Sequence, residues 1–210
     1  MTPKITMPRW AARLREPWRF KVIRGGRGSS KSWTVARHYL LTSSQQALQG
    51  LCVRETQESL ADSVHRLLSN QIEEMGLPGW TIQRERIFHV NGSEITFAGI
   101  RTDPAKIKSA EGVDWCWVEE AETVSKASWD ILIPTIRGRG AKNPDGTFQG
   151  AEICITFNPR EKTDPTYQRF VDNPPPNALV LEVNWRDNPW FPESLKVEKD
   201  HLARTDPDRS

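Results

Sequence analysis

Several features that would assign this 210-residue chain to a class at once are scarce or absent. There is no apolar run near the roughly 18 residues of a membrane-spanning helix and no signal-peptide pattern, so neither membrane insertion nor secretion is indicated. The three cysteines, Cys52, Cys116 and Cys154, have no metal-ligand spacing, and their odd number argues against a disulfide framework. Each lies in an apolar, strand-like run, so we expect buried, reduced thiols in a reducing intracellular compartment.

Strong net charge is also lacking, at +2, but the charges are unevenly distributed. Basic residues gather at the start, where Glu16 is the one acidic residue among the first 31. These basic residues are Lys4, Arg9, Arg13, Arg15, Arg19, Lys21, Arg24, Arg27 and Lys31. Such a face can contact the phosphates of a nucleotide or a nucleic acid, or it can be ordinary solvated surface.

Short apolar runs rich in β-branched residues recur along the chain, and helical patterns or long connections separate several of them. The runs are Phe20–Ile23, Leu51–Val53, Trp115–Val118, Ile153–Phe157 and Leu179–Val183. Their alternation with helices predicts an α/β fold with a central, mainly parallel sheet flanked by helices.

The segments between these runs carry their own signals. Residues 33–42 and 57–75 have apolar side chains at helical spacing, and residues 125–136 predict a helix that ends near Pro134. Asn91-Gly92 predicts a hairpin with a tight two-residue turn. The glycine-rich residues 137–150 predict an exposed loop or hairpin.

Residues 24–32 have the sequence RGGRGSSKS, between a predicted strand and a predicted helix. A strand, a glycine-rich turn, Lys-Ser and a helix form the layout of a phosphate-binding loop. Glycines allow backbone N–H groups to point into one concavity, and the helix adds its positive N-terminal end. Lys31 can reach the β- and γ-phosphates, and Ser32 is placed to hold Mg²⁺. A nucleoside triphosphate is therefore the first ligand we expect.

The residues predicted to surround the phosphates are Gly25, Gly26, Arg27, Gly28, Ser29, Ser30, Lys31 and Ser32. The strict pattern has a glycine immediately before the lysine, where this chain has Ser30. The alternative is a glycine-rich turn whose lysine and serine are merely solvated.

Two carboxylates, Glu119 and Glu120, follow the apolar run Trp115–Val118. At the carboxyl end of a parallel strand they would face the same crevice as the phosphate loop. We expect Glu119 to help hold Mg²⁺ beside Ser32, and Glu120 to orient and activate the attacking water. The alternative is an acidic start to the next helix, which the helix dipole also favours.

Other polar groups follow predicted strands. Thr156 and Asn158 end the run Ile153–Phe157 and could contact a γ-phosphate or its water, or could simply form a strand end with a turn. Arg54 and Glu55 close another run, and we favour a structural pair over a role in the site. Trp18 is near enough in sequence to be considered for stacking on a base.

The motifs RGGRGSSKS, CVRET, IKSAEGVDWCWVEEAE, ITFNP and WRDNPWFPESL together resemble the ATPase half of a tailed-phage terminase large subunit, most of all the Sf6-type. The resemblance covers about residues 20–195. It implies an additional-strand, RecA-like P-loop NTPase fold and an ATP- and Mg²⁺-dependent motor that packages double-stranded DNA into a procapsid, in the host cell cytoplasm.

The same resemblance implies roles for residues. Gly25 to Ser32 becomes the Walker A loop, Glu119 the Walker B acid, Glu120 the catalytic carboxylate, and Thr156 to Asn158 the coupling motif. Some relatives carry an arginine four residues before the lysine, which here is Arg27. Arg24 and Arg137 are rival arginine fingers, Arg137 acting in trans from a neighbouring subunit.

The resemblance also implies domains and partners. We expect an ATPase domain over residues 1–184 and, over residues 185–210, the start of a linker towards a C-terminal nuclease domain that the chain does not include, so no nuclease activity. Expected partners are double-stranded DNA, the portal protein, the small terminase subunit and further copies in a ring, with no membrane. Candidate contacts to the DNA backbone are Lys106, Lys108, Arg137, Arg139 and Lys142.

Two other functions stay open. A small-molecule P-loop kinase would need an acceptor pocket and an arginine lid, although the paired glutamates favour water as the acceptor. A nucleotide-gated assembly module would bind ATP with little turnover when isolated.

Overall fold

A computed structural model describes residues 5–56, 61–110, 112–138, 141–142, 148–149 and 151–197. Its centre is an eight-stranded sheet in the order β10-β1-β9-β6-β2-β5-β4-β3. The strands are β1 (Phe20–Arg24), β2 (Gln49–Arg54), β3 (Trp80–Ile82), β4 (Arg86–His89), β5 (Glu94–Gly99), β6 (Trp115–Val118), β9 (Glu152–Phe157) and β10 (Ala178–Glu182). The run from β10 to β5 is parallel, and β4 and β3 add an antiparallel edge.

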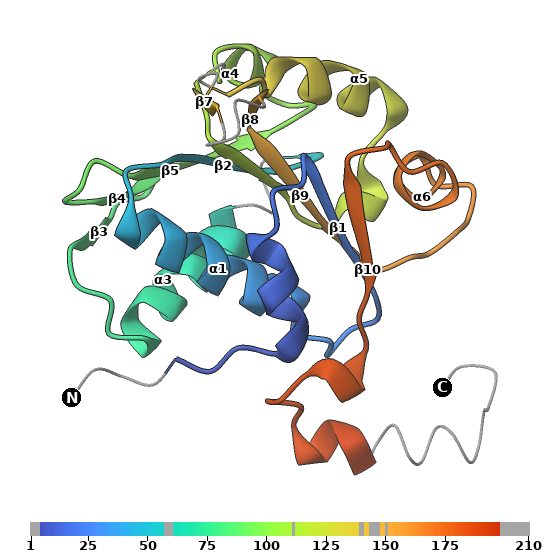
Figure 1. Ribbon diagram of the computed structural model, residues 1–210, viewed down its shortest axis with the longest axis horizontal. Coiled ribbons are helices and arrows are strands. Elements are labelled where there is room, and N and C mark those ends of the chain that lie inside the picture. Colours follow the sequence, from blue (N-terminus) through green and yellow to red (C-terminus); the bar gives the residue numbers. More distant parts are fainter. Residues whose placement is uncertain are drawn as a thin grey trace.

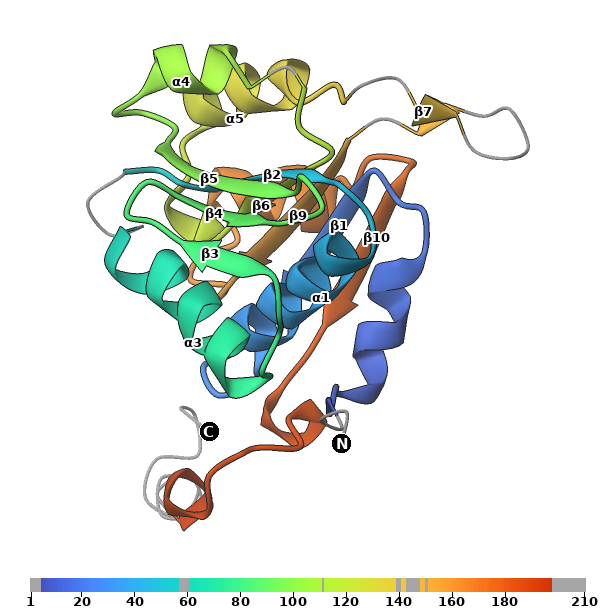
Figure 2. The ribbon, with the colours of Figure 1, turned by 90° about the vertical axis from the view of Figure 1, so that its left-hand side faces the viewer.

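Helices cover both faces of the sheet (Figures 1 and 2). Helices α1 (Lys31–Gln45) and α3 (Arg66–Glu74) lie on one face, and α4 (Pro104–Lys108) and α5 (Lys126–Thr135) lie on the other. The shorter helical segments are η1 (Arg9–Arg15), η2 (Ala61–His65), η3 (Ala121–Thr123), α6 (Pro165–Tyr167), η4 (Gln168–Asp172) and η5 (Trp185–Asp187). This arrangement confirms the predicted α/β fold.

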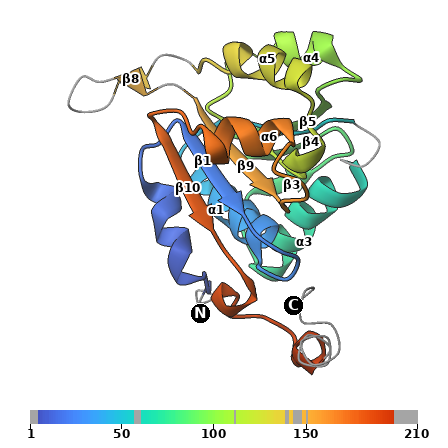
Figure 3. The ribbon, with the colours of Figure 1, turned by 90° about the vertical axis from the view of Figure 1, so that its right-hand side faces the viewer.

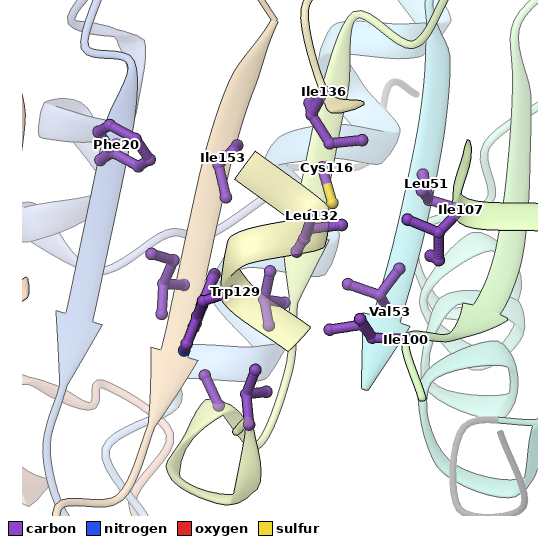
Figure 4. Packing of buried hydrophobic residues seen from close by; sticks show 14 of the residues in the cluster. Phe20, Leu51, Val53, Ile100, Ile107, Cys116, Trp129, Leu132, Ile136 and Ile153 are labelled. Carbon is purple, nitrogen blue, oxygen red and sulfur yellow. The ribbon is translucent and has the colours of Figure 1, made fainter. Parts of the chain in front are cut away.

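The sheet is buried on both faces, and successive side chains of each strand point to opposite faces, so the core has two parts. In β2, Leu51 and Val53 pack towards α4 and α5, while Cys52 packs towards α1 and α3. In β6, Cys116 likewise packs towards α4 and α5, and Trp117 packs towards α1 and α3. Figure 4 shows side chains of the first cluster, including Leu132 of α5, packed over the sheet. All three cysteines are buried and free, as expected.

The five predicted strands are confirmed, with Trp115–Val118 unchanged and the bounds of the other four shifted by one or two residues. The hairpin is also confirmed, but its turn is longer than predicted. The backbone N–H of His89 donates to the carbonyl of Ser93 at 2.8 Å, which leaves three residues in the turn. Gly92 has a φ of 96°, so it supplies the left-handed position that ends such a turn.

The predicted helices are confirmed in the described residues. The first part of the helix predicted over 57–75 lies outside them; the rest forms η2 and α3. Pro134 lies in the last turn of α5. Within 137–150, β7 (Ala141–Lys142) pairs antiparallel with β8 (Phe148–Gln149), which confirms a hairpin. No helix in the described ranges is long and apolar enough to span a bilayer.

Strand order brings distant segments together. Strand β9 lies between β1 and β6, as the additional-strand fold requires (Figure 2). Figure 3 shows β10, β1 and β9 from the other side. Because β1, β9, β6 and β2 are parallel, their carboxyl ends meet at one edge of the sheet. Polar residues follow each of these ends, and that edge is the place to look for a site.

Candidate active site

The segment between β1 and α1 is a tight loop in which Gly25 and Gly28 cannot carry a side chain. Gly25 has a φ of 155°, and a Cβ there would lie 1.7 Å from the carbonyl oxygen of Val183. Gly28 has a φ of 79°, and a Cβ there would lie 2.7 Å from the ring of Phe191. The chain after β10 therefore packs directly on the loop.

Ser30 adopts the backbone conformation for which glycine is usually needed. Its φ of 61° and ψ of 16° are left-handed, and α1 begins at the next residue. A serine carries a cost of about 1 kcal/mol there. The loop thus keeps its shape despite the departure from the strict pattern.

Lys31 is folded back onto the loop. Its Nζ lies 2.7 Å from the carbonyl oxygen of Gly25, 2.9 Å from that of Gly26, 2.9 Å from Ser29 Oγ and 3.0 Å from Asn158 Oδ1. Burial lowers the pKa of Lys31 to about 8, against the opposing effect of nearby carboxylates. The four oxygen partners compensate the charge of its ammonium group.

The first turn of α1 contacts the end of β6. Ser32 Oγ donates to Glu119 Oε1 at 3.0 Å. Burial raises the pKa of the Glu119 carboxyl, and the charge of Arg54 opposes this shift. A hydroxyl and a carboxylate oxygen side by side are ligands that suit Mg²⁺, which takes its other ligands from water and phosphate. In the described ranges no group of three His, Cys, Asp or Glu side chains could hold a metal ion.

Glu120 follows Glu119 but is more exposed, with 48% of its side chain accessible. Its φ of 52° is the other non-glycine left-handed value in the described residues. Strained backbone of this kind is concentrated at functional sites. The two acids thus have different environments, one buried against Ser32 and one facing the cavity.

Arg54 contacts both candidate carboxylates, whereas we favoured a structural pair with Glu55. Its Nε lies 2.7 Å from Glu119 Oε2, and its Nη1 lies 3.1 Å from Glu120 Oε2. Glu55 instead accepts a hydrogen bond of 3.3 Å from the backbone N–H of Ser125. The sequence alone did not show that β2 and β6 are neighbours, and so did not reveal this contact.

The end of β9 places Thr156 and Asn158 differently. Asn158 contacts Lys31 through its side chain. The Thr156 hydroxyl accepts a 2.9 Å hydrogen bond from Trp117 Nε1 beneath the site. Glu122, which sequence reasoning missed, is buried beside them, and its Oε2 accepts a 3.4 Å hydrogen bond from Asn158 N. The one sequence feature that could have indicated Glu122 is its position three residues after Glu119.

Residues from the loop, from the end of β6 and from the end of β9 line a cavity of about 530 Å³. Its polar part is formed by the loop, by Glu119, Glu120 and Glu122, and by the end of β9. The rest of its wall is formed by Trp33 and by residues from 188 to 195. A cavity of this size can hold a nucleotide.

The three candidate arginines lie in different places. Arg27 is exposed and lines the cavity. Arg24 lies outside its lining and instead pairs with Glu182 and contacts the ring of Tyr167, which disfavours it as a catalytic group in its own subunit. Arg137 lines a second cavity, so any role in this site would have to be in trans.

The second cavity also accounts for Trp18. It is about 1430 Å³ in volume and is lined by η1 residues, Trp18, Lys21 and Asp114, among others. Lys21 lies near the start of β1 and Asp114 directly precedes β6, so this cavity lies at the amino ends of the strands, on the opposite edge from the phosphate loop. Trp18 is therefore not placed to contact a base beside Lys31.

Comparison with known proteins agrees with this geometry. A family model described as "Phage terminase large subunit" matches residues 18–210. The chain is 28% identical to the PBSX phage terminase large subunit of Bacillus subtilis (strain 168), over 90% of this chain and 47% of the relative. The chain thus spans about half the length of this curated relative.

Solved structures share the fold. The large terminase from a thermophilic bacteriophage superimposes with a TM-score of 0.71 at 11% identity, over 94% of this chain and 50% of that one. The same terminase in complex with ATP-gamma-S gives a TM-score of 0.69 at 10% identity, over 94% and 49%.

Proposed function

The chain belongs to the phage terminase large subunit family, and from this we propose that it is the ATP-hydrolysing motor domain of a DNA-packaging terminase. Such a motor would drive double-stranded DNA into a procapsid. The ATP-gamma-S complex of the thermophilic phage terminase supports ATP as the ligand.

One observation carries the proposal. Ser32 Oγ lies 3.0 Å from Glu119 Oε1, while Lys31 and Glu120 line the same cavity. A phosphate-binding lysine, a metal-binding pair and a second carboxylate are the groups that hydrolysis of a triphosphate requires.

In this proposal Lys31 exchanges the loop carbonyls for the β- and γ-phosphate oxygens. Ser32 and Glu119 hold Mg²⁺, which would neutralise phosphate charge when bound. Glu120 accepts a proton from the attacking water, and Arg27 stabilises the negative charge that develops on the transferred group. Arg54 is a positioning residue that holds both carboxylates.

The finer assignments are also proposals. Residues 1–184 form the main part of the ATPase domain, and residues 185–210 lead from its cavity wall towards a nuclease domain. Thr156 to Asn158 couple hydrolysis to motion, and Arg137 acts on a neighbouring subunit.

The assembled motor is a ring that contacts the portal protein and the small terminase subunit in the host cytoplasm. A translocase must hold every sequence equally, so DNA contacts go to the backbone. Lys106 and Lys108 on α4 are candidates together with Arg137, two residues after the end of α5. The side chains of Arg139 and Lys142 lie outside the described residues.

The test is ATP binding and phosphate release by the wild-type chain, Lys31→Ala and Glu120→Gln, with and without double-stranded DNA. We expect wild type to hydrolyse ATP, Glu120→Gln to bind ATP with at least about 100-fold slower release, and Lys31→Ala to bind poorly. Binding without release in wild type would favour a nucleotide-gated module. ADP formation without free phosphate, and only with an added phosphate acceptor, would favour a kinase. Absence of nucleotide binding would overturn the proposal.

A further inference from the structure

The cavity that holds the phosphate loop has an apolar end with no role in the chemistry proposed above. This end is formed by Trp33, in the first turn of α1, and by Trp190, Pro192 and Leu195 after β10. Of the five large apolar side chains that are exposed in the described ranges, two line this cavity: Trp33 and Leu195, each at 42%. Exposed apolar surface inside a ligand cavity indicates an apolar part of the ligand.

The wall is held in place by specific contacts. Asn188 Nδ2 donates to the carbonyl oxygen of Gly28 at 2.6 Å, and Asn188 Oδ1 accepts from the backbone N–H of Trp190 at 2.8 Å. A single side chain therefore joins the phosphate loop to the segment that carries Trp190. Both ends of the carboxamide are used in this link.

The two tryptophan rings are positioned by a buried cation. The Arg37 guanidinium lies 4.7 Å from the ring centre of Trp190 and 5.6 Å from that of Trp33. Arg37 is itself held by Gln71, by Glu74 at 3.1 Å and by the carbonyl of Thr6 at 3.0 Å. The ring centres are 6.4 Å apart with planes at 43°, so the rings contact each other and leave no parallel slot between them.

We propose that Trp33, Trp190, Pro192 and Leu195 form the base subsite of the nucleotide whose phosphates contact Lys31. This inference rests on the proposed function and adds to it the part of the protein that recognises the base. A planar base lies on this wall by stacking and apolar contact, because aromatic faces and aliphatic carbons are what the wall presents. The site therefore favours a large purine over a small pyrimidine.

The arrangement along the chain supports this assignment. Trp33 directly follows Ser32, so a ligand whose phosphates lie on the loop has its other end within reach of the first turn of α1. The carboxylates Glu119, Glu120 and Glu122 lie in the polar part of the same cavity. One amphipathic ligand with a charged end and a flat apolar end fits both parts.

The experiment measures dissociation constants of Mg²⁺-ATP, Mg²⁺-CTP and Mg²⁺-tripolyphosphate for the whole chain. The variants are Trp33→Ala, Trp190→Ala and Trp190→Phe, with Trp18→Ala as a matched control from the opposite edge of the sheet. Thermal unfolding of each variant checks that it is folded. Tripolyphosphate lacks a base, so it separates the phosphate site from the base subsite.

We expect Trp33→Ala and Trp190→Ala to weaken ATP binding by about tenfold, to reduce the preference for ATP over CTP, and to leave tripolyphosphate binding unchanged. Trp190→Phe should retain most of the affinity, and Trp18→Ala all of it. Equal losses for ATP and tripolyphosphate, or unchanged ATP binding in both alanine variants, would overturn the base subsite. If wild type binds neither ATP nor tripolyphosphate, the phosphate site itself, and with it the proposed function, fails.

Discussion

Arg54 Nε lies 2.7 Å from Glu119 Oε2, and this ion pair joins the end of β2 to the end of β6 inside the candidate site. Both side chains are nearly buried, at 7% and 12% exposure. Removing one partner of a buried pair leaves an uncompensated charge, which costs more than the pair contributes.

We therefore predict that Arg54→Ala lowers the free energy of unfolding by about 3 kcal/mol in urea titrations. Arg24→Ala is the matched control, because its partner Glu182 is largely exposed and its loss should cost about 1 kcal/mol or less. Similar small losses in both variants would show that the Arg54 pair is not a buried one in solution.

The lowered pKa of Lys31, at about 8, predicts proton uptake when nucleotide binds. A phosphate favours the charged ammonium, so at pH 8 binding should take up about half a proton, and less at pH 7. Calorimetry in two buffers of different ionisation enthalpy measures this number. Lys31→Arg keeps its charge and should show no such uptake; an equal uptake in that variant would assign the proton to another group.

Ser30 and Ser29 are neighbours with opposite predicted responses to glycine. Ser30→Gly removes left-handed strain and should leave the free energy of unfolding unchanged or raise it by up to about 1 kcal/mol. Ser29→Gly removes the hydroxyl that donates to the Gly26 carbonyl and accepts from Lys31 Nζ. This change should lower the free energy of unfolding by about 1–2 kcal/mol. Urea unfolding of both variants measures the difference. A loss at Ser30 as large as at Ser29 would mean that the Ser30 side chain itself stabilises the loop.

Thr156 provides a test of a structural against a chemical role. Thr156→Val leaves the buried Trp117 N–H without its acceptor and should cost about 1–3 kcal/mol of unfolding free energy. Thr156→Ser keeps the hydroxyl and should retain both stability and phosphate release. If Thr156→Ser abolishes coupling to DNA while remaining stable, the methyl group matters for motion and the coupling proposal gains support.

Arg27 and Arg24 should separate in a turnover assay. Arg27→Ala is expected to reduce phosphate release at saturating ATP by at least about tenfold with little change in thermal stability, because it removes a cation from the cavity wall. Arg24→Ala should leave release nearly unchanged. The reverse result would require Arg24 to leave Glu182 and enter the cavity when nucleotide binds.

Local patterns in the sequence were sufficient for much of the site. The glycines and Lys31 between a strand and a helix predicted a phosphate loop, and the acids after Trp115–Val118 predicted a facing strand end. The structure brings both segments to one cavity. These features are recognisable because each depends on residues adjacent in the chain. The family resemblance added roles for residues that the patterns alone left open.

Contacts between strands that are distant in sequence could not be predicted in this way. Arg54 contacts Glu119 because β2 pairs with β6, and no local periodicity encodes that pairing. We expect residues 185–210 to begin a linker, and no local pattern within them showed that Asn188 and Trp190 line the cavity. The hairpin turn was misjudged because Asn-Gly favours a two-residue turn, whereas the observed pairing of His89 with Ser93 places only Gly92 in the left-handed region.

The hydrogen bond from Asn188 to Gly28 links the phosphate loop directly to the chain that leaves the sheet after β10. A pull on residues beyond Trp190 is transmitted to the loop backbone through this carboxamide. If ligand binding and a displacement of the outgoing chain both shift Gly28, each changes the free energy of the other by the same coupling free energy. Tension on that chain and occupancy of the cavity are therefore two readouts of one equilibrium.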